Sequence, residues 1–93
     1  MTSVLKKADN VITRHIADET LLVPIRGKLV DMQKLYALDP TAEFIWNLID
    51  GEKSLADILD AVVAEFDVGS EQAQSDLQEL VDALLREEMV IEA

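Results

Sequence analysis

The 93-residue sequence lacks several features that would point to particular functions. It has no cysteine, which excludes disulfides, thiolate metal sites and cysteine nucleophiles. No apolar run is long enough to cross a bilayer, and the N-terminal segment MTSVLKKADNV lacks the apolar stretch of a signal peptide. Aromatic residues make up only 4% of the chain and hydrophobic residues 49%, so an aliphatic core is expected. We therefore expect one soluble, cytoplasmic domain.

Basic residues are scarce in the second half of the chain. Residues 1–38 contain six bases and four acids, whereas residues 39–93 contain two bases and fifteen acids, within a net charge of −11. A strongly acidic surface repels nucleic acids and anionic membranes and favours a neutral or basic partner. We therefore expect neither a nucleic acid nor a membrane as a partner.

Patterns typical of catalysis and metal binding are also missing. The single histidine, His15, has no carboxylate or nucleophile at a characteristic spacing, and general acid–base catalysis requires such positioned partners. Carboxylates lie three residues apart at Asp57 and Asp60 and at Asp76 and Glu79, without histidines or the glycine of a calcium loop. We interpret them as solvated helix faces and expect no enzymatic activity, no metal and no cofactor.

The first part of the chain is expected to form short strands. The polar residues 1–10 are interpreted as a flexible N-terminus, so that the domain covers residues 11–93. The segment VITRHI at 11–16 and the apolar run at 21–25 predict two strands. The proline within the second run is typical of an edge strand or of a strand end. A third strand is expected within residues 28–38, where KLYAL has a strand-like pattern.

From Asp39 onward the hydrophobic period changes from two to 3.6 residues, which indicates helices. Asp39 is expected to cap a first helix that ends near Ile49, and Ser54 to cap a second helix that ends at Phe66. Ser70 is expected to cap a third helix. The apolar stripe of that helix consists of Ala73, Leu77, Leu80, Val81, Leu84 and Leu85.

Three short N-terminal strands followed by three helices predict an α+β domain of the winged-helix kind. A short apolar tail at 89–91 would add a further strand, and Phe44 and Trp46 are expected to belong to the core, with Trp46 beneath the sheet. Winged helices often bind DNA, but the third helix would present six acids and only Arg86 to the phosphate backbone. A DNA-binding regulator is therefore the weaker alternative.

The strand KLYAL is expected at the edge of the small sheet, beside the third helix. An extended peptide can pair with such an edge as an additional strand and place its side chains in the groove against the helix. Alternatively, the domain's own residues or a second copy of the chain cover the edge, which would make the protein a structural or dimerising module. The residues alone leave both alternatives open.

The segment YALDPTAEFIWNLIDGEKSLADILDAVVAEFDV and the later DLQELVDALLREEMV resemble the PqqD family. The upstream segment TLLVPIRGKLV resembles the second strand of that family, so the resemblance covers roughly residues 12–91. The pattern comprises Leu38-Asp39, Thr41-Ala42, Ile45-Trp46, the turn from Leu48 to Gly51, the capped helix from Ser54 to Phe66, and Asp76-Leu77 followed by paired leucines up to Leu85.

The resemblance implies a small winged-helix peptide chaperone, also called a RiPP recognition element. Such domains bind the leader of a ribosomally made precursor peptide and present it to a modifying enzyme, often a radical SAM enzyme, as in PQQ biosynthesis. In the family the leader pairs with the third strand, in the cleft against the third helix. By position, the matching residues here are Lys34, Leu35, Tyr36, Ala37 and Leu38 on the strand and Gln74, Leu77, Gln78, Val81 and Leu85 on the helix.

Two departures concern the pathway. The link GKLVDMQKLYALD is longer than in the branch of the family that serves quinone synthesis, and Glu87-Glu88 stands where that branch has a small residue or glycine. These differences put the quinone pathway in question and leave the peptide-binding role implied by the resemblance intact. Other members of the family serve lasso-peptide and other peptide-modifying systems.

Overall fold

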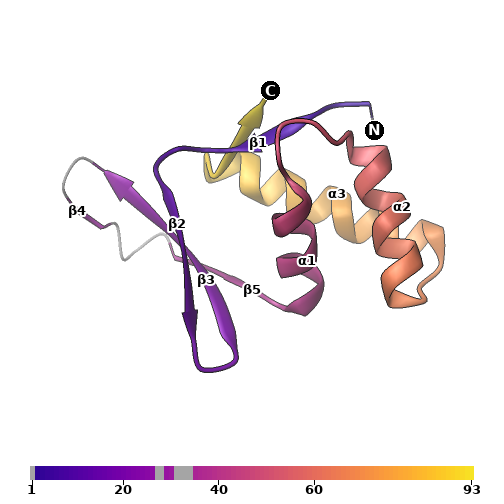
Figure 1. The fold of residues 1–93 in the computed structure, drawn as a ribbon, viewed down its shortest axis with the longest axis horizontal. Helices are drawn as coiled ribbons and strands as arrows, with labels where there is room; N and C mark the ends of the chain where they lie inside the picture. Colours follow the sequence, from indigo (N-terminus) through magenta and orange to yellow (C-terminus); the bar gives the residue numbers. More distant parts are fainter. Residues whose placement is uncertain (1, 27–28, 31–34) are drawn as a thin grey trace.

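The structure of the protein, a computed structural model, describes residues 2–26, 29–30 and 35–93. Strands precede the helices along the chain, and a last strand follows them (Figure 1), which confirms the expected α+β class. The winged-helix arrangement stays a prediction. The elements are β1 (Leu5–Lys7), β2 (Val11–Ile16), β3 (Glu19–Arg26), β4 (Leu29–Val30), β5 (Tyr36–Leu38), α1 (Pro40–Leu48), α2 (Leu55–Phe66), α3 (Ser70–Arg86) and β6 (Val90–Glu92).

The larger sheet is built around β3. Strand β2 pairs antiparallel with one side of β3, and both β4 and β5 pair antiparallel with its other side. Strands β2 and β3 confirm the two strands expected at 11–16 and 21–25. The third expected strand, at 28–38, corresponds to β4 and β5, with residues 28 and 31–34 lying outside the described residues.

The expectation that residues 1–10 form a flexible tail is wrong for Leu5–Lys7, which belong to a second, smaller sheet. Strand β1 pairs antiparallel with β6, so that Lys6 lies opposite Ile91, and the side chain of Leu5 is only 2% exposed. Strand β6 confirms the short strand expected at 89–91. The apolar stretch Val4-Leu5 is too short to predict a strand by itself, and its partner comes from the opposite end of the sequence.

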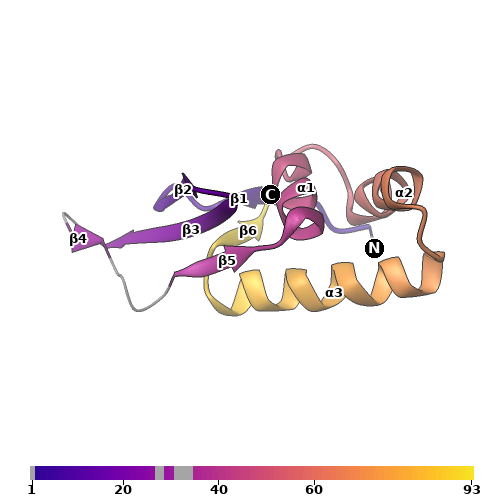
Figure 2. The same ribbon diagram turned by 90° about the horizontal axis from the view of Figure 1, so that it is seen from below.

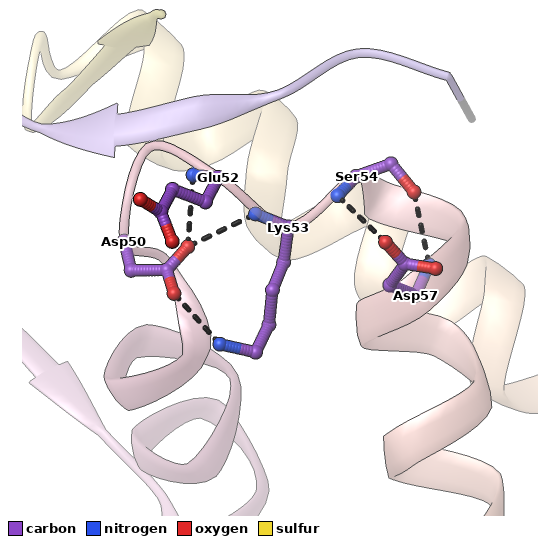
Figure 3. Close-up of polar contacts among 5 residues, drawn as sticks. All are labelled: Asp50, Glu52, Lys53, Ser54 and Asp57. Carbon is purple, nitrogen blue, oxygen red and sulfur yellow. Dashed lines mark hydrogen bonds and ion pairs between the residues drawn. The ribbon is translucent and has the colours of Figure 1, made fainter.

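Local capping explains where the helices begin. Asp39 is the N-cap of α1, as expected, and its Oδ1 accepts a hydrogen bond from the Ala42 backbone N–H at 2.8 Å. Ser54 caps α2, and its exchange of two hydrogen bonds with Asp57, both 3.2 Å long, forms a capping box (Figure 3). The expected Ser70 cap is wrong: Gly69 occupies the N-cap of α3 and Ser70 is the first helical residue.

The connection between α1 and α2 is organised by one carboxylate. Oδ1 of Asp50 accepts hydrogen bonds from the backbone N–H groups of Glu52 (2.9 Å) and Lys53 (3.0 Å), and Oδ2 accepts one from the Lys53 ammonium at 2.7 Å (Figure 3). The Lys53 side-chain hydrogen bond, followed by the backbone hydrogen bonds, holds the pKa of Asp50 well below its usual value. Gly51 within this turn has a φ of +81°, a backbone conformation that residues other than glycine rarely adopt.

The core lies between the helix-facing side of the sheet and the three helices. Figure 2 shows α3 as a separate layer that crosses α1 and α2 along one side of the molecule. Trp46 of α1 is 2% exposed, and its Nε1 donates a hydrogen bond to Thr13 Oγ1 of β2 at 3.2 Å, which confirms the expected place of this residue beneath the sheet. The Lys7 ammonium lies 5.2 Å from the centroid of the Trp46 ring, and burial lowers the pKa of this lysine.

The core extends along all three helices. Its remaining buried members are Leu5, Leu22, Leu38, Ile45, Ile49, Leu55, Ile58, Val62, Ala73, Leu77, Leu80, Val81, Leu84, Met89 and Val90. Phe44 and Phe66 pack edge to face at its margin, with ring centroids 5.1 Å apart. Among the described residues, no helix has the length and apolar character needed to cross a membrane.

Candidate functional site

Strand β5 offers a backbone edge next to the helical layer. Its residues pair with β3 on one side, where Leu38 lies opposite Thr20 and Tyr36 opposite Leu22. Within residues 2–26, 29–30 and 35–93, no strand pairs with its other side. Backbone N–H and C=O groups on an unpaired edge can accept an additional strand.

A groove lies along β5, between this strand, the start of α1 and the middle of α3. Its volume is about 360 Å³, and we call it the β5 groove. The chain reverses direction here, because Asp39 and Pro40 end the strand and begin α1. The β5 groove is lined by Tyr36, Ala37, Asp39, Thr41, Ala42, Ile45, Asp76, Glu79 and Leu80.

The lining of the β5 groove combines apolar walls with negative charge. Asp39 contributes a carboxylate that also caps α1, and Asp76 accepts a 2.8 Å hydrogen bond from the Gln72 amide. Glu79 supplies a third carboxylate, and the described residues of the lining include no Lys, Arg or His. The groove therefore suits a ligand with both apolar and cationic groups.

The strand residues predicted as a site fall in different environments. Lys34 lies outside the described residues. Leu35 lines a different hollow, together with residues of β2 and β3 such as Ile12 and Val23. Tyr36 and Ala37 line the β5 groove, whereas Leu38 is buried in the core. Of the four predicted strand residues that the structure describes, two line the groove.

The predicted helix residues are spread around α3. Leu77 and Val81 are 0% and 2% exposed and pack in the core. Gln74 and Gln78 are exposed and line a hollow on the outer side of α3. Leu85 lies 39% exposed near β6, beside a further hollow.

The residues of α3 that do line the β5 groove are Asp76, Glu79 and Leu80. None of them belongs to the predicted site. Leu80 was part of the predicted apolar stripe, and the two acids lie within one turn of it. The helical period does not distinguish the two flanks of the stripe. The prediction took the flank of Gln74 and Gln78, whereas Asp76 and Glu79 on the opposite flank line the β5 groove.

His15 belongs to a polar cluster between the sheet and α1. The Thr20 hydroxyl donates a hydrogen bond to Glu43 of α1, and His15 Nδ1 lies 3.1 Å from the same hydroxyl oxygen. These contacts connect β2, β3 and α1 through the side chain of Thr20, which is buried. Within the described part of the chain, no three His, Cys, Asp or Glu side chains cluster in a way that could hold a metal ion.

Comparison with known proteins gives two matches. The family model of coenzyme PQQ synthesis protein D (PqqD) matches residues 19–90. A solved structure, TbiB1 in complex with the TbiA(beta) leader peptide, is similar with a TM-score of 0.73 and 29% sequence identity, over 91% of this chain and 93% of that one. No curated protein matches the chain.

Proposed function

The chain belongs to the PqqD family, and on this premise we propose that it binds the leader segment of a ribosomally made precursor peptide. The leader pairs with the outer edge of β5 as an additional strand and lies in the β5 groove against α3. The similar TbiB1 structure contains a leader peptide, which supports this ligand class.

The proposal rests on one observation: the outer edge of β5 pairs with no other described strand and lies beside a groove. Backbone hydrogen bonds to an edge strand provide affinity for any extended segment, and the pockets for alternate side chains provide selectivity. A site of this kind needs little from the side chains of β5 itself. Only Tyr36 and Ala37 of the strand reach the groove.

The protein acts by position and has no catalytic step of its own. Binding the leader to a domain that also docks on a modifying enzyme raises the effective concentration of the peptide's core region at that enzyme. We propose a partner enzyme of the radical SAM class, with proteases and cyclases of peptide-modifying systems as the other candidates. Neither a cofactor nor a metal on this chain is needed for such a role.

Titration of ¹⁵N-labelled protein with the leader of a precursor peptide encoded beside its gene tests the proposal. Amide resonances of β5 and of the α3 turn around Glu79 should shift in a saturable way, while those of α2 should not. A scrambled leader of equal composition is the control, because it has the same charge but a different side-chain order. Shifts that are absent from β5, or equal for both peptides, would refute binding at this edge.

A further inference from the structure

The chemistry of the β5 groove restricts which leader it accepts. Resting on the proposed function, we infer that the bound leader carries a Lys or Arg that reaches Asp76 and Glu79. A large apolar residue two positions away fills the wall formed by Ala42, Ile45 and Leu80.

Among the residues that the structure describes, no basic side chain lines the groove beside its carboxylates. Asp76 and Glu79 lie three residues apart on α3, a spacing that places both on one side of the helix. The hydrogen bond from Gln72 to Asp76 comes from a neutral amide and leaves the charge of the carboxylate in place. In the part of the chain that the structure describes, the ion pair present is Lys53–Asp50, in the connection between α1 and α2.

The apolar part of the groove adjoins these carboxylates. Ile45 is buried, Ala42 is half-buried, and Leu80 emerges from the core stripe of α3 one residue after Glu79. The aliphatic stem of a lysine or arginine packs well against such a surface while its charged end remains solvated. A leader carboxylate at the same place would face like charges and would be disfavoured.

The spacing of the two leader residues follows from strand geometry. Successive side chains of a strand point to opposite faces, so residues that share a face are two apart. The cation and the apolar residue both enter the β5 groove, and they therefore occupy positions i and i+2 of the leader in either order. The intervening residue of the leader points to the opposite face, away from the β5 groove.

A selection from a display library of peptides with twelve consecutive randomised residues tests this inference on the full chain. Peptides enriched by the unmodified protein should carry Lys or Arg two positions from a large apolar residue. The double variant Asp76→Asn/Glu79→Gln should lose this enrichment and bind the selected peptides about three- to tenfold more weakly. The matched control Asp60→Asn/Glu65→Gln removes the same charge from exposed positions of α2 and should keep both enrichment and affinity.

The outcomes separate this inference from the proposed function. Selected peptides that shift the β5 amides without any cationic preference would overturn the inference and leave leader binding intact. Equal weakening by both double variants would also overturn it, because the charge effect would then be long-range. Failure of every peptide, and of the encoded leader, to perturb β5 would refute strand addition itself.

Discussion

Strand β5 and helix α1 are consecutive in the sequence but are used in opposite ways. Helix α1 contributes side chains to the interior: Ile45 and Trp46 are buried, and the Trp46 indole is hydrogen-bonded to β2. Strand β5 contributes a backbone edge with which no other described strand pairs, and only its first two side chains line the adjoining groove. Asp39 separates the two, as the cap that ends the extended chain and starts the helix.

On the proposed function, three of the four aromatic residues lie away from the binding surface, and Tyr36 lines the β5 groove. The single Trp and both Phe lie on the helical side, in or beside the core. Recognition is assigned to a strand of three residues whose contribution is mainly peptide groups. Substitutions in α1 should therefore change stability, whereas substitutions in the wall of the β5 groove should change peptide affinity.

The largest effect is expected for Trp46→Ala. Removing a fully buried indole should lower the free energy of unfolding by about 3–5 kcal/mol, as measured by urea denaturation. Trp46→Phe keeps an aromatic ring in the core and should lose less. A Trp46→Ala variant that is as stable as the parent but no longer binds the leader would assign Trp46 to the binding surface and break the contrast.

The next largest effect is expected for Ala42→Trp, which should weaken leader affinity. Ala42 lines the β5 groove from α1, so an indole at this position would occupy the space assigned to the leader. We expect at least about a tenfold loss of leader affinity in a fluorescence titration, equivalent to about 1.4 kcal/mol. The control Ala64→Trp, at an exposed position of α2, should bind normally. Unchanged affinity of a folded Ala42→Trp protein would place the leader elsewhere.

Ser54→Ala tests how far the helical layer depends on its caps. The substitution removes the hydrogen bond from the Asp57 N–H to Ser54 Oγ and should cost about 1 kcal/mol of stability. Ser75→Ala, in the exposed middle of α3, should change stability little, because alanine is a good helix former. Leader affinity should stay the same in both variants, and a selective loss in Ser54→Ala would show that the α2 cap also supports the groove.

The smallest effect is expected for Asp50→Asn, and it should depend on pH. The folded-state pKa of Asp50 lies below the unfolded value of about 3.9, so its charge stabilises the fold above about pH 4. That contribution is lost as pH falls through the unfolded pKa towards the folded one. The urea midpoint of Asp50→Asn should therefore lie slightly below that of the parent at pH 7, and the gap should narrow at pH 3. A gap that widens in acid would contradict the assigned role.

Local signals predicted much of the fold. Asp39 and Ser54 were identified as caps because their side chains act on backbone groups within three residues, and both caps are present. The buried stripe of α3 followed from its helical period, apart from Leu85, which is exposed. Features set by contacts between distant segments were missed, since β1 depends on β6 for its partner.

The site was predicted less completely than the fold. The sequence indicated the edge strand and α3, but a helix wheel shows only which residues flank the buried stripe. The flank that faces β5 is fixed by how α1 and α3 pack, and it carries Asp76 and Glu79 rather than Gln74 and Gln78. Leu77 and Val81 lie on the core stripe itself, where they support the helix without reaching the groove.

The pairing of β1 with β6 also bears on how the domain is made. Leu5 leaves the ribosome early in translation, but β6, the strand with which it pairs, is synthesised after all three helices. During most of translation, Leu5 therefore has no β6 residue to pair with. The backbone of this segment can bond earlier to the α1–α2 connection, where the Gly51 N–H donates to the Leu5 carbonyl at 2.9 Å, but its pairing with β6 becomes attainable only when Val90–Glu92 leaves the exit tunnel. The small sheet therefore forms after all three helices have been synthesised.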